Sequence, residues 1–302
     1  MSKISDHIRK NFKKTDEERD AGLQTPDNII RYDDIVYGND KNIQVLDVYK
    51  LKEDANKTLP TIISVHGGGW VYGDKEKYQF YCMNLAQRGF AVVNFTYRLA
   101  PENKFPASLE DTCMVFNWIW NHKEEYGFDA NHIFAVGDSA GANILSLACA
   151  ISCNEEYANQ FDFDINSNFK LKAIALNCGT NIIKVSSHPK DKFSTELMKD
   201  CLENEGTKEE LYLVNVLNHI NEKYPPTFLM SAENDFLKSQ MLPVASKLLE
   251  KNVPFVVKYY KDPSEKLGHV FHLNIRSNAA NRCNDDECEF FKSFIINNSS
   301  NK

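Results

Sequence analysis

The stretch Gly137-Asp138-Ser139-Ala140-Gly141 constrains the fold of this chain more than any other part of the sequence. It follows the apolar run 133–136, which is typical of a buried strand, and precedes the small and apolar residues 142–148, which are typical of a closely packed helix. Glycines two positions before and after a serine permit a turn so sharp that side chains there would clash with the strand and the helix. We therefore expect Ser139 to lie at a tight strand-to-helix turn, with its hydroxyl lifted clear of a sheet.

A serine in this position has the geometry of a nucleophile elbow, because the helix that begins beneath it presents free backbone N–H groups to a developing anion. A structural turn with an incidental serine fits the same five residues, since glycines flank a serine by chance in many chains. The rest of the sequence decides between the two interpretations.

Three consecutive glycines form a second feature that points to a site. The segment His66-Gly67-Gly68-Gly69-Trp70 follows 61–65, an apolar run expected to be a strand. Such a run of glycines costs conformational entropy and marks a backbone that bends sharply or approaches something closely. With no Cβ in the way, the N–H groups of Gly67 and Gly68 can point at a substrate oxygen, as in an oxyanion hole. His66 is expected to brace this loop from behind.

Apolar runs and helical patterns alternate through most of the chain, which predicts an α/β fold with a mostly parallel central sheet flanked by helices. A β-hairpin is expected within 33–49, strands at 61–65, 90–95, 133–136, 171–177, 227–232 and 255–260, and helices at 77–88, 109–126, 142–148, 241–251 and 284–296. Sites in such sheets form beyond the carboxyl ends of the strands. The glycine run and Ser139 should therefore face the same crevice.

Two parts of the chain depart from this alternation. Residues 1–28 are charged and have weak helical periodicity, and residues 181–224 contain helical patterns around 196–202 and 209–217. We expect one domain over 1–302, in which the parts at about 1–28 and 181–224 form a small helical cap.

The charge balance narrows the class of partner. The 302 residues carry a formal net charge of −7 and contain no long basic stripe, which argues against nucleic acid and anionic membranes as partners. The N-terminus is polar and no apolar run is long enough to span a bilayer, so a cytoplasmic protein is expected. The sequence leaves the oligomeric state open, with a homodimer among the alternatives.

The eight cysteines are expected to be reduced, because several lie in apolar patterns where a free cysteine behaves as a small hydrophobic residue. Cys149 and Cys153 have helical i,i+4 spacing, and Cys283 and Cys288 flank an acidic turn. Neither pair has a His or Cys at the spacing of a zinc site. No metal and no cofactor are expected.

Taken together, three motifs resemble those of the hormone-sensitive-lipase-like family of α/β-hydrolase carboxylesterases. They are His66-Gly67-Gly68-Gly69-Trp70, Tyr97-Arg98-Leu99-Ala100-Pro101-Glu102 and Gly137-Asp138-Ser139-Ala140-Gly141, and they occur in the order typical of the family. The resemblance extends from about Val45 to the C-terminal helix. It implies the α/β-hydrolase fold and the hydrolysis of esters.

The resemblance also implies roles for particular residues. It makes Ser139 the nucleophile, with an oxyanion hole formed by the N–H groups of Gly67, Gly68 and Ala140. The acid of the family matches Asp235 and the base matches His269, which is followed two positions later by an aromatic residue, Phe271. The chain order Ser139, Asp235, His269 is that of this fold.

Alternatives remain for two of these roles. The segment before Asp235, Ser231-Ala232-Glu233-Asn234, replaces the commoner version that begins with glycine, so Glu233 stays a rival for the acid. Asp262 and Glu265 are weaker rivals, because they lie on the same loop as the expected base. His272 is a rival base in a segment that looks packed.

The expected activity is hydrolysis of small esters with short acyl chains through an acyl-enzyme intermediate. A carbohydrate-ester deacetylase or feruloyl esterase would use the same residues. A ligand-binding protein without catalysis is a third interpretation, and the complete set Ser139, Asp235 and His269 argues against it.

Overall fold

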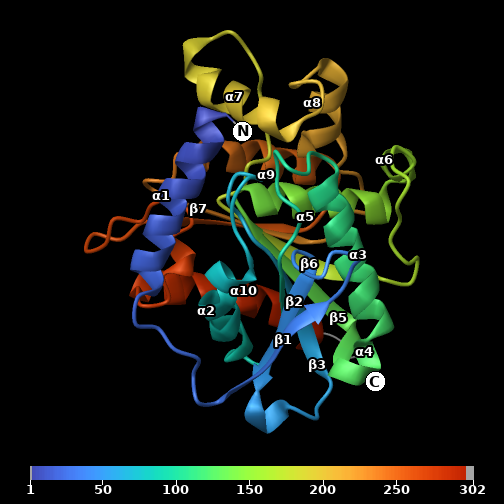
Figure 1. The fold of residues 1–302 in the computed structure, drawn as a ribbon. Helices are drawn as coiled ribbons and strands as arrows, with labels where there is room; N and C mark the ends of the chain where they lie inside the picture. The colour runs from blue at the N-terminus through green and yellow to red at the C-terminus, as the bar shows by residue number, and fades with distance from the viewer. Residues whose placement is uncertain (1, 297–302) are drawn as a thin grey trace.

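The computed structural model describes residues 2–296 and contains one eight-stranded sheet (Figure 1). Its order is β1-β2-β4-β3-β5-β6-β7-β8. The strands are β1 (Ile29–Val36), β2 (Val45–Leu51), β3 (Leu59–Val65), β4 (Ala91–Phe95), β5 (Phe128–Asp138), β6 (Leu171–Asn177), β7 (Thr227–Ala232) and β8 (Phe255–Tyr260). The expected hairpin is present, because β1 pairs with β2 in antiparallel register.

The six strands from β4 to β8 in this order are parallel to one another, and only β2, which pairs with β1 and β4, runs in the opposite direction. The prediction of a mostly parallel sheet is therefore confirmed. The register pairs Val65 with Gly137 and Asp138 with Asn177. The carboxyl ends of β3, β5 and β6 are consequently level, which places the glycine run beside the turn at Ser139.

The helices that pack on the sheet occupy most of the expected positions. They are α2 (Lys75–Ala86), α3 (Ala107–Asn121), α4 (Lys123–Tyr126), α5 (Ala140–Cys153), α6 (Glu155–Ala158), α9 (Met241–Glu250) and α10 (Asn278–Ile296). The single helix expected at 109–126 is divided at His122, whose Nδ1 lies 2.8 Å from the carbonyl oxygen of Trp118. Helix α10 begins six residues before the expected start at 284, and the polar stretch after α5 contains the short α6.

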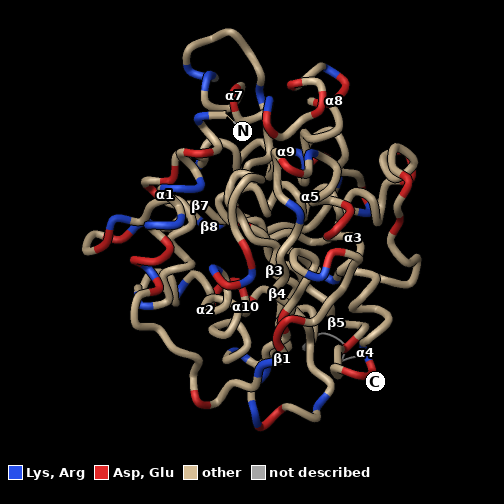
Figure 2. The backbone as a smooth tube through the Cα atoms, viewed as in Figure 1, with Lys and Arg blue, Asp and Glu red and all other residues tan. Residues whose placement is uncertain are grey.

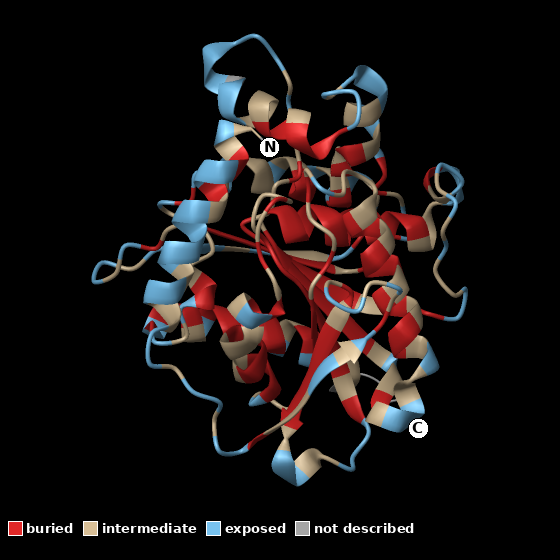
Figure 3. Ribbon diagram, in the orientation of Figure 1, coloured by how far each residue is buried: buried red, intermediate tan, exposed pale blue. Residues whose placement is uncertain are grey.

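Two apolar cores lie on the two faces of the sheet (Figure 3). One core joins the sheet to α3, α5 and α9, and the other joins it to α2 and α10. The strands β3 and β4 are buried along nearly their whole length and β5 is buried from residue 133 to 138, as expected of strands covered on both faces.

A third apolar cluster lies above the carboxyl end of the sheet, where α1 (Lys3–Asp20), α7 (Lys192–Cys201) and α8 (Lys208–Val214) are located (Figure 1). It contains Ile8 from α1 and Leu197 from α7, together with Val71 from the loop after β3. The side chain of Ser5 also donates a hydrogen bond to Asp200. The two parts of the sequence that depart from the α/β alternation therefore pack against each other.

Acidic and basic residues are mixed along α1 and along the rest of the chain (Figure 2). None of the helices among residues 2–296 combines the length and the apolar character needed to cross a membrane. All eight cysteines are free thiols.

Candidate active site

Ser139 lies between β5 and α5 with a backbone φ of 51° and ψ of −118°. A positive φ is costly for a residue with a side chain, and two backbone hydrogen bonds hold it in place. Its N–H donates to the carbonyl oxygen of Asn177, and its own carbonyl oxygen accepts from the N–H of Thr180, both at 3.0 Å. A Cβ at Gly137 would lie 2.6 Å from the carbonyl oxygen of Gly141, and a Cβ at Gly141 would overlap the carbonyl oxygen of Val65. The small residues around Ser139 are therefore required by the turn.

The structure brings the three residues of the expected catalytic set together. The Oγ of Ser139 lies 2.9 Å from Nε2 of His269, and Nδ1 of His269 lies 2.7 Å from Oδ1 of Asp235. The carboxylate of Asp235 is fully buried, whereas 15% of the His269 side chain is exposed. The imidazole thus connects a buried charge to a hydroxyl that lines a pocket.

Hydrogen bonds keep the Asp235 carboxylate ionised. Burial alone would raise its pKa, but donation from His269 and Ser231 and from the N–H of Leu237 outweighs burial and lowers the pKa to about 2. The hydroxyl of Ser231 donates to Oδ2 at 2.6 Å, and the Leu237 N–H donates to Oδ1 at 2.9 Å. Ser231 thus contacts the Asp235 carboxylate directly, a contact that was not predicted from the sequence.

The rival acids make their contacts elsewhere. Glu233 forms an ion pair with Lys261 at 3.0 Å, and its side chain is 39% exposed. Asp262 pairs with Arg282 at 2.6 Å, and Glu265 accepts a hydrogen bond from Ser277. The described contacts connect none of these three carboxylates to His269.

His272, the rival base, is fully buried and lies edge-to-face with Tyr81, at a ring-centroid distance of 5.1 Å. Burial lowers its pKa to about 3. Within residues 2–296, neither of its ring nitrogens has a hydrogen-bond partner. His272 is therefore a neutral core side chain without access to substrate.

The N–H groups of the glycine run differ in whether they already have a hydrogen-bond partner. The N–H of Gly67 donates to the hydroxyl of Tyr78 at 2.8 Å, and this hydroxyl donates to Oδ2 of Asp138, also at 2.8 Å. The Gly67 N–H is thus already engaged, which disfavours the expectation that it serves the oxyanion hole. No hydrogen bond among the described residues uses the N–H of Gly68, Gly69 or Ala140.

The backbone conformation of the loop explains why glycine is needed at positions 68 and 69. Gly68 and Gly69 both have positive φ, at 115° and 63°, so only glycine adopts their conformation without strain. A Cβ on Gly68 would overlap the carbonyl oxygen of Tyr72, and Gly69 lines the same pocket as Ser139. Gly69 was not among the expected donors, although it is the third glycine of the run.

His66 braces this loop, as expected. Its ring stacks on Tyr97 at a centroid distance of 3.9 Å, and its Nδ1 lies 2.8 Å from the carbonyl oxygen of Gly67. Burial lowers the pKa of His66 to about 4, so the ring is neutral at physiological pH. Asp138 is buried nearby, and burial raises its pKa to about 7.

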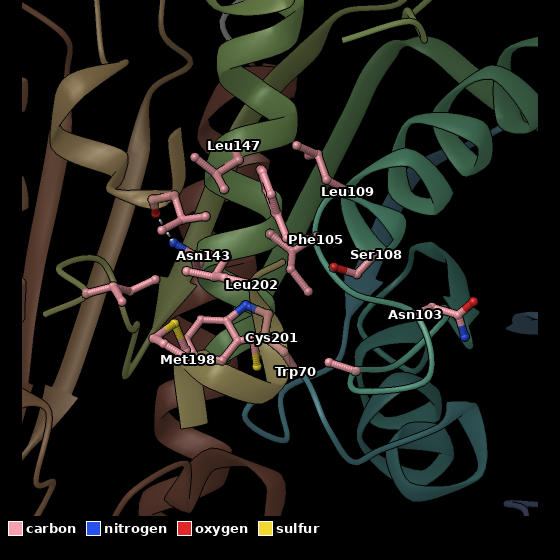
Figure 4. Close-up of a pocket in the computed structure, with 14 residues that line it drawn as sticks. Trp70, Asn103, Phe105, Ser108, Leu109, Asn143, Leu147, Met198, Cys201 and Leu202 are labelled. Carbon is pink, nitrogen blue, oxygen red and sulfur yellow. Dashed lines mark hydrogen bonds between the residues drawn. The ribbon is translucent and has the colours of Figure 1, made fainter. Parts of the chain in front are cut away.

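A pocket of 540 Å³ opens over Ser139 between α1, α7 and the loop after β7. One wall contains Trp70, Ile183 and Met198, which also line an apolar cavity of 20 Å³ (Figure 4). The second cavity lies between α3, α5 and α7 and holds little more than one water-sized group. The wall around Trp70 is therefore where the larger pocket ends.

One group of side chains has the composition of a metal site. The ligand atoms of Cys178, Asp235 and His269 lie within 4.8 Å of one another, and no other such group occurs in the part of the chain that the structure describes. Burial raises the pKa of Cys178 far above its ordinary value, which keeps it a neutral thiol. Because Asp235 and His269 are already hydrogen-bonded to each other, this group is better suited to orienting a histidine than to holding a metal.

Comparison with known proteins shows which proteins this chain resembles. The family model BD-FAE matches residues 46–251. The chain is 28% identical over 233 residues to the versiconal hemiacetal acetate esterase of Dothistroma septosporum, covering 70% of this chain and 67% of that protein. It is 31% identical over 124 residues to the esterase LipC of Mycobacterium tuberculosis, covering 41% of this chain and 30% of that protein. The chain thus spans between 30% and 67% of the length of these relatives.

A solved structure shares the fold over nearly the whole chain. Esterase B from Lactobacillus rhamnosis superimposes with a TM-score of 0.87 at 23% identity and covers 98% of both chains. The α/β-hydrolase fold and the resemblance to hormone-sensitive-lipase-like carboxylesterases are therefore confirmed. Because the matched family region extends over more than half of the chain, the protein belongs to the BD-FAE family of α/β-hydrolases.

Proposed function

We propose that the protein is a serine carboxylesterase that hydrolyses small esters with short acyl chains. The observation that carries this proposal is the continuous hydrogen-bonded path from Ser139 through His269 to the ionised Asp235. A hydroxyl is a poor nucleophile at its own pKa and needs an oriented base to remove its proton. The exposed edge of His269 and the pocket over Ser139 provide that base and room for a substrate.

In the proposed reaction, Ser139 Oγ attacks the ester carbonyl while His269 Nε2 accepts its proton. Asp235 accepts a hydrogen bond from Nδ1–H of the imidazole, which selects the reactive tautomer and stabilises the imidazolium. His269 then donates its proton to the leaving alcohol, and the acyl group remains on Ser139. Water activated by the same imidazole releases the acid and restores the serine.

The oxyanion formed in each half-reaction needs donors that the protein does not use elsewhere. The N–H groups of Gly68, Gly69 and Ala140 meet this condition, since no described group accepts a hydrogen bond from them. We therefore place the oxyanion hole at these three residues, with Gly67 acting as a support. Removing one such donor typically costs about 10²- to 10³-fold in kcat.

The pocket supports a short acyl chain. It ends at the wall of Trp70, Ile183 and Met198, and the cavity behind this wall is too small for a long chain. Two relatives have names that agree with small acyl groups: one is an acetate esterase, and esterase B was solved in a C6-C4 SN3 inhibited form.

The proposal is tested with the 4-nitrophenyl esters of acetate and butyrate and the variant Ser139→Ala. We expect the wild-type protein to hydrolyse both esters and the variant to lose at least about 10³-fold in kcat/KM, because the nucleophile is removed. Circular dichroism checks that the variant is folded. Activity of the folded variant within tenfold of the wild type would reject Ser139 as the nucleophile.

A further inference from the structure

Another pocket adjoins the 540 Å³ pocket at Ser139, and aromatic rings line it. This pocket of 210 Å³ lies on the side of His269 and its neighbour Val270, between α1 and the glycine run. The rings of Phe12, Tyr72 and Phe236 line it. The two pockets share Phe12, Ser139, Phe236 and His269 and so form one catalytic cleft with two lobes. The larger lobe ends at Trp70, and the smaller one, which we call the aromatic lobe, is lined by four aromatic side chains, those already named and Tyr78.

The chemistry of the proposed reaction assigns the two lobes. His269 must protonate the oxygen of the leaving alcohol, so the alcohol part of the ester has to lie on the side of the imidazole. The ring of Phe236 is 4.4 Å from that of His269, between centroids. His269 and Phe236 line both lobes, but Trp70 and α7 line only the larger one, whereas Val270, the neighbour of His269, lines only the smaller one. The alcohol therefore occupies the aromatic lobe, and the acyl chain occupies the larger one.

The aromatic rings of this lobe are unusually open to solvent. Phe236 is 70% exposed and Phe12 is 37% exposed. Phe236 directly follows the buried Asp235, so an apolar ring is held at the cleft although it contributes little to the core. Exposed apolar surface that lines a cleft commonly marks a binding site.

The aromatic lobe is also positioned before any ligand binds. Phe12 meets Tyr72 edge-to-face, with centroids 6.0 Å apart, and the Tyr72 hydroxyl donates to Asp16 at 2.9 Å. Helix α1, which carries Phe12, is held at its far end by Arg19, whose guanidinium donates to the carbonyl oxygen of Lys77 at 2.6 Å. Binding an aromatic group here requires little ordering of side chains.

Apart from the catalytic Ser139 and His269, the polar side chains of the lobe are already hydrogen-bonded within the protein. The Thr15 hydroxyl donates to the carbonyl oxygen of Asn11, and Asp16 accepts from Tyr72 and from Arg19. The remaining pair, Tyr78 and Asp138, are hydrogen-bonded to each other. A sugar would find few free partners for its hydroxyls, whereas a flat apolar ring would find aromatic edges and faces.

We propose that the preferred substrates are esters of aromatic alcohols, whose ring lies in the aromatic lobe against Phe236 and Phe12 while the alcohol oxygen faces His269. This inference rests on the proposed esterase function. It goes further by naming the class of the leaving alcohol.

The test compares benzyl butyrate with cyclohexylmethyl butyrate, two esters of primary alcohols of similar size. We expect kcat/KM for the benzyl ester to be roughly threefold to tenfold higher, the range that aromatic pairing typically supplies. The variants Phe236→Leu and Phe12→Leu keep an apolar side chain and should lower this ratio toward one. The control Tyr212→Ala removes an exposed aromatic of α8 outside both lobes and should leave the ratio unchanged.

Two results would overturn this inference while leaving the esterase function in place. One is a ratio near one in a wild-type protein that hydrolyses both esters and loses activity in Ser139→Ala. The other is faster hydrolysis of acetylated glucose than of benzyl acetate. If neither ester is hydrolysed and Ser139→Ala matches the wild type on the 4-nitrophenyl esters as well, the esterase function itself fails and the inference falls with it.

Discussion

Two histidines three positions apart show how strongly the surroundings of a residue decide its role. His269 reaches Ser139 and Asp235, whereas His272 is buried against Tyr81 without a hydrogen-bond partner among the described residues. A sequence pattern does not separate them well, because both lie beside aromatic residues in one short segment. The contacts of the two histidines do separate their roles, and variants of each residue can be compared directly.

We expect His269→Ala to lower kcat by at least about 10³-fold, because the base and the leaving-group acid are removed together. His272→Ala should keep kcat within about tenfold and instead lower the melting temperature, since it leaves a cavity beside Tyr81. Steady-state kinetics with 4-nitrophenyl butyrate and thermal unfolding of both variants check this. The opposite order of kinetic damage would assign the base to His272.

A second comparison concerns the acid. Asp235→Asn should lower kcat by roughly 10³- to 10⁴-fold, because the amide no longer fixes the reactive tautomer of His269. Glu233→Gln should have nearly wild-type kcat, since this side chain pairs with Lys261 at the surface. The ionised state of Asp235, with a pKa of about 2, should persist through the range pH 5–8 in which the two variants are assayed. A severe effect of Glu233→Gln with a mild effect of Asp235→Asn would exchange the two roles.

Among the elements, α10 is joined to α2 and to the sheet through one buried carboxyl. Glu287 accepts hydrogen bonds from Tyr81 of α2 at 3.0 Å and from the Asn177 side chain of β6 at 2.6 Å. The backbone of Asn177 in turn accepts from the N–H of Ser139. Helix α10 therefore supports the strand end beneath the nucleophile.

This arrangement makes stability depend on pH. Burial raises the pKa of Glu287 to about 7, from an ordinary value of 4.5. The folded protein then holds the proton more tightly than the unfolded chain does, so the contribution of Glu287 to stability is full below pH 4.5 and is lost as the pH rises through about 7. The loss should be roughly 3 kcal/mol in the free energy of unfolding.

The variant Glu287→Gln has no proton to lose and should remove this part of the pH dependence. Urea unfolding of the wild type and the variant at pH 5 and pH 8 measures it, because other titrating groups contribute equally to both proteins. Parallel pH dependences in the two proteins would show that the Glu287 carboxyl does not titrate between folded and unfolded states as proposed.

For the whole molecule, the packing of α1 and α7 over the sheet sets the size of the larger lobe, where we place the acyl chain. Trp70, Ile183 and Met198 form the wall between this lobe and the small cavity behind it (Figure 4). Each acyl methylene that contacts the lobe contributes about 0.8 kcal/mol, and methylenes beyond the wall remain in water or force strain. We expect kcat/KM to peak between acetyl and about hexanoyl esters and to fall steeply for longer chains.

Removal of the wall should shift this optimum. The variant Trp70→Ala joins the two cavities and should move the optimum toward longer chains, whereas Trp120→Ala, which removes a tryptophan outside the catalytic pocket, should not. A series of 4-nitrophenyl esters from acetyl to palmitoyl measures the shift. A wild-type rate that rises up to palmitoyl, or that increases abruptly when the substrate forms an emulsion, would contradict the short lobe.

Much of the architecture was predictable from local sequence patterns. The strand-to-helix turn at Ser139 follows from Gly137 and Gly141, because any larger residue would collide with the adjoining backbone. The parallel sheet follows from the alternation of apolar strands with helical patterns, since crossover helices cover both faces. These are short-range constraints, so neighbouring residues are enough to state them.

Only the tertiary structure decided which groups are free to act. The N–H of Gly67 was expected in the oxyanion hole, but Tyr78, which α2 brings from eleven residues further along, takes it. The aromatic lobe likewise joins Phe12 of α1 to Phe236 beyond β7. A sequence pattern shows that a donor or a ring exists, but whether it faces a partner or a substrate depends on packing between distant segments, because each hydrogen bond and each apolar contact uses a surface that is then unavailable for another.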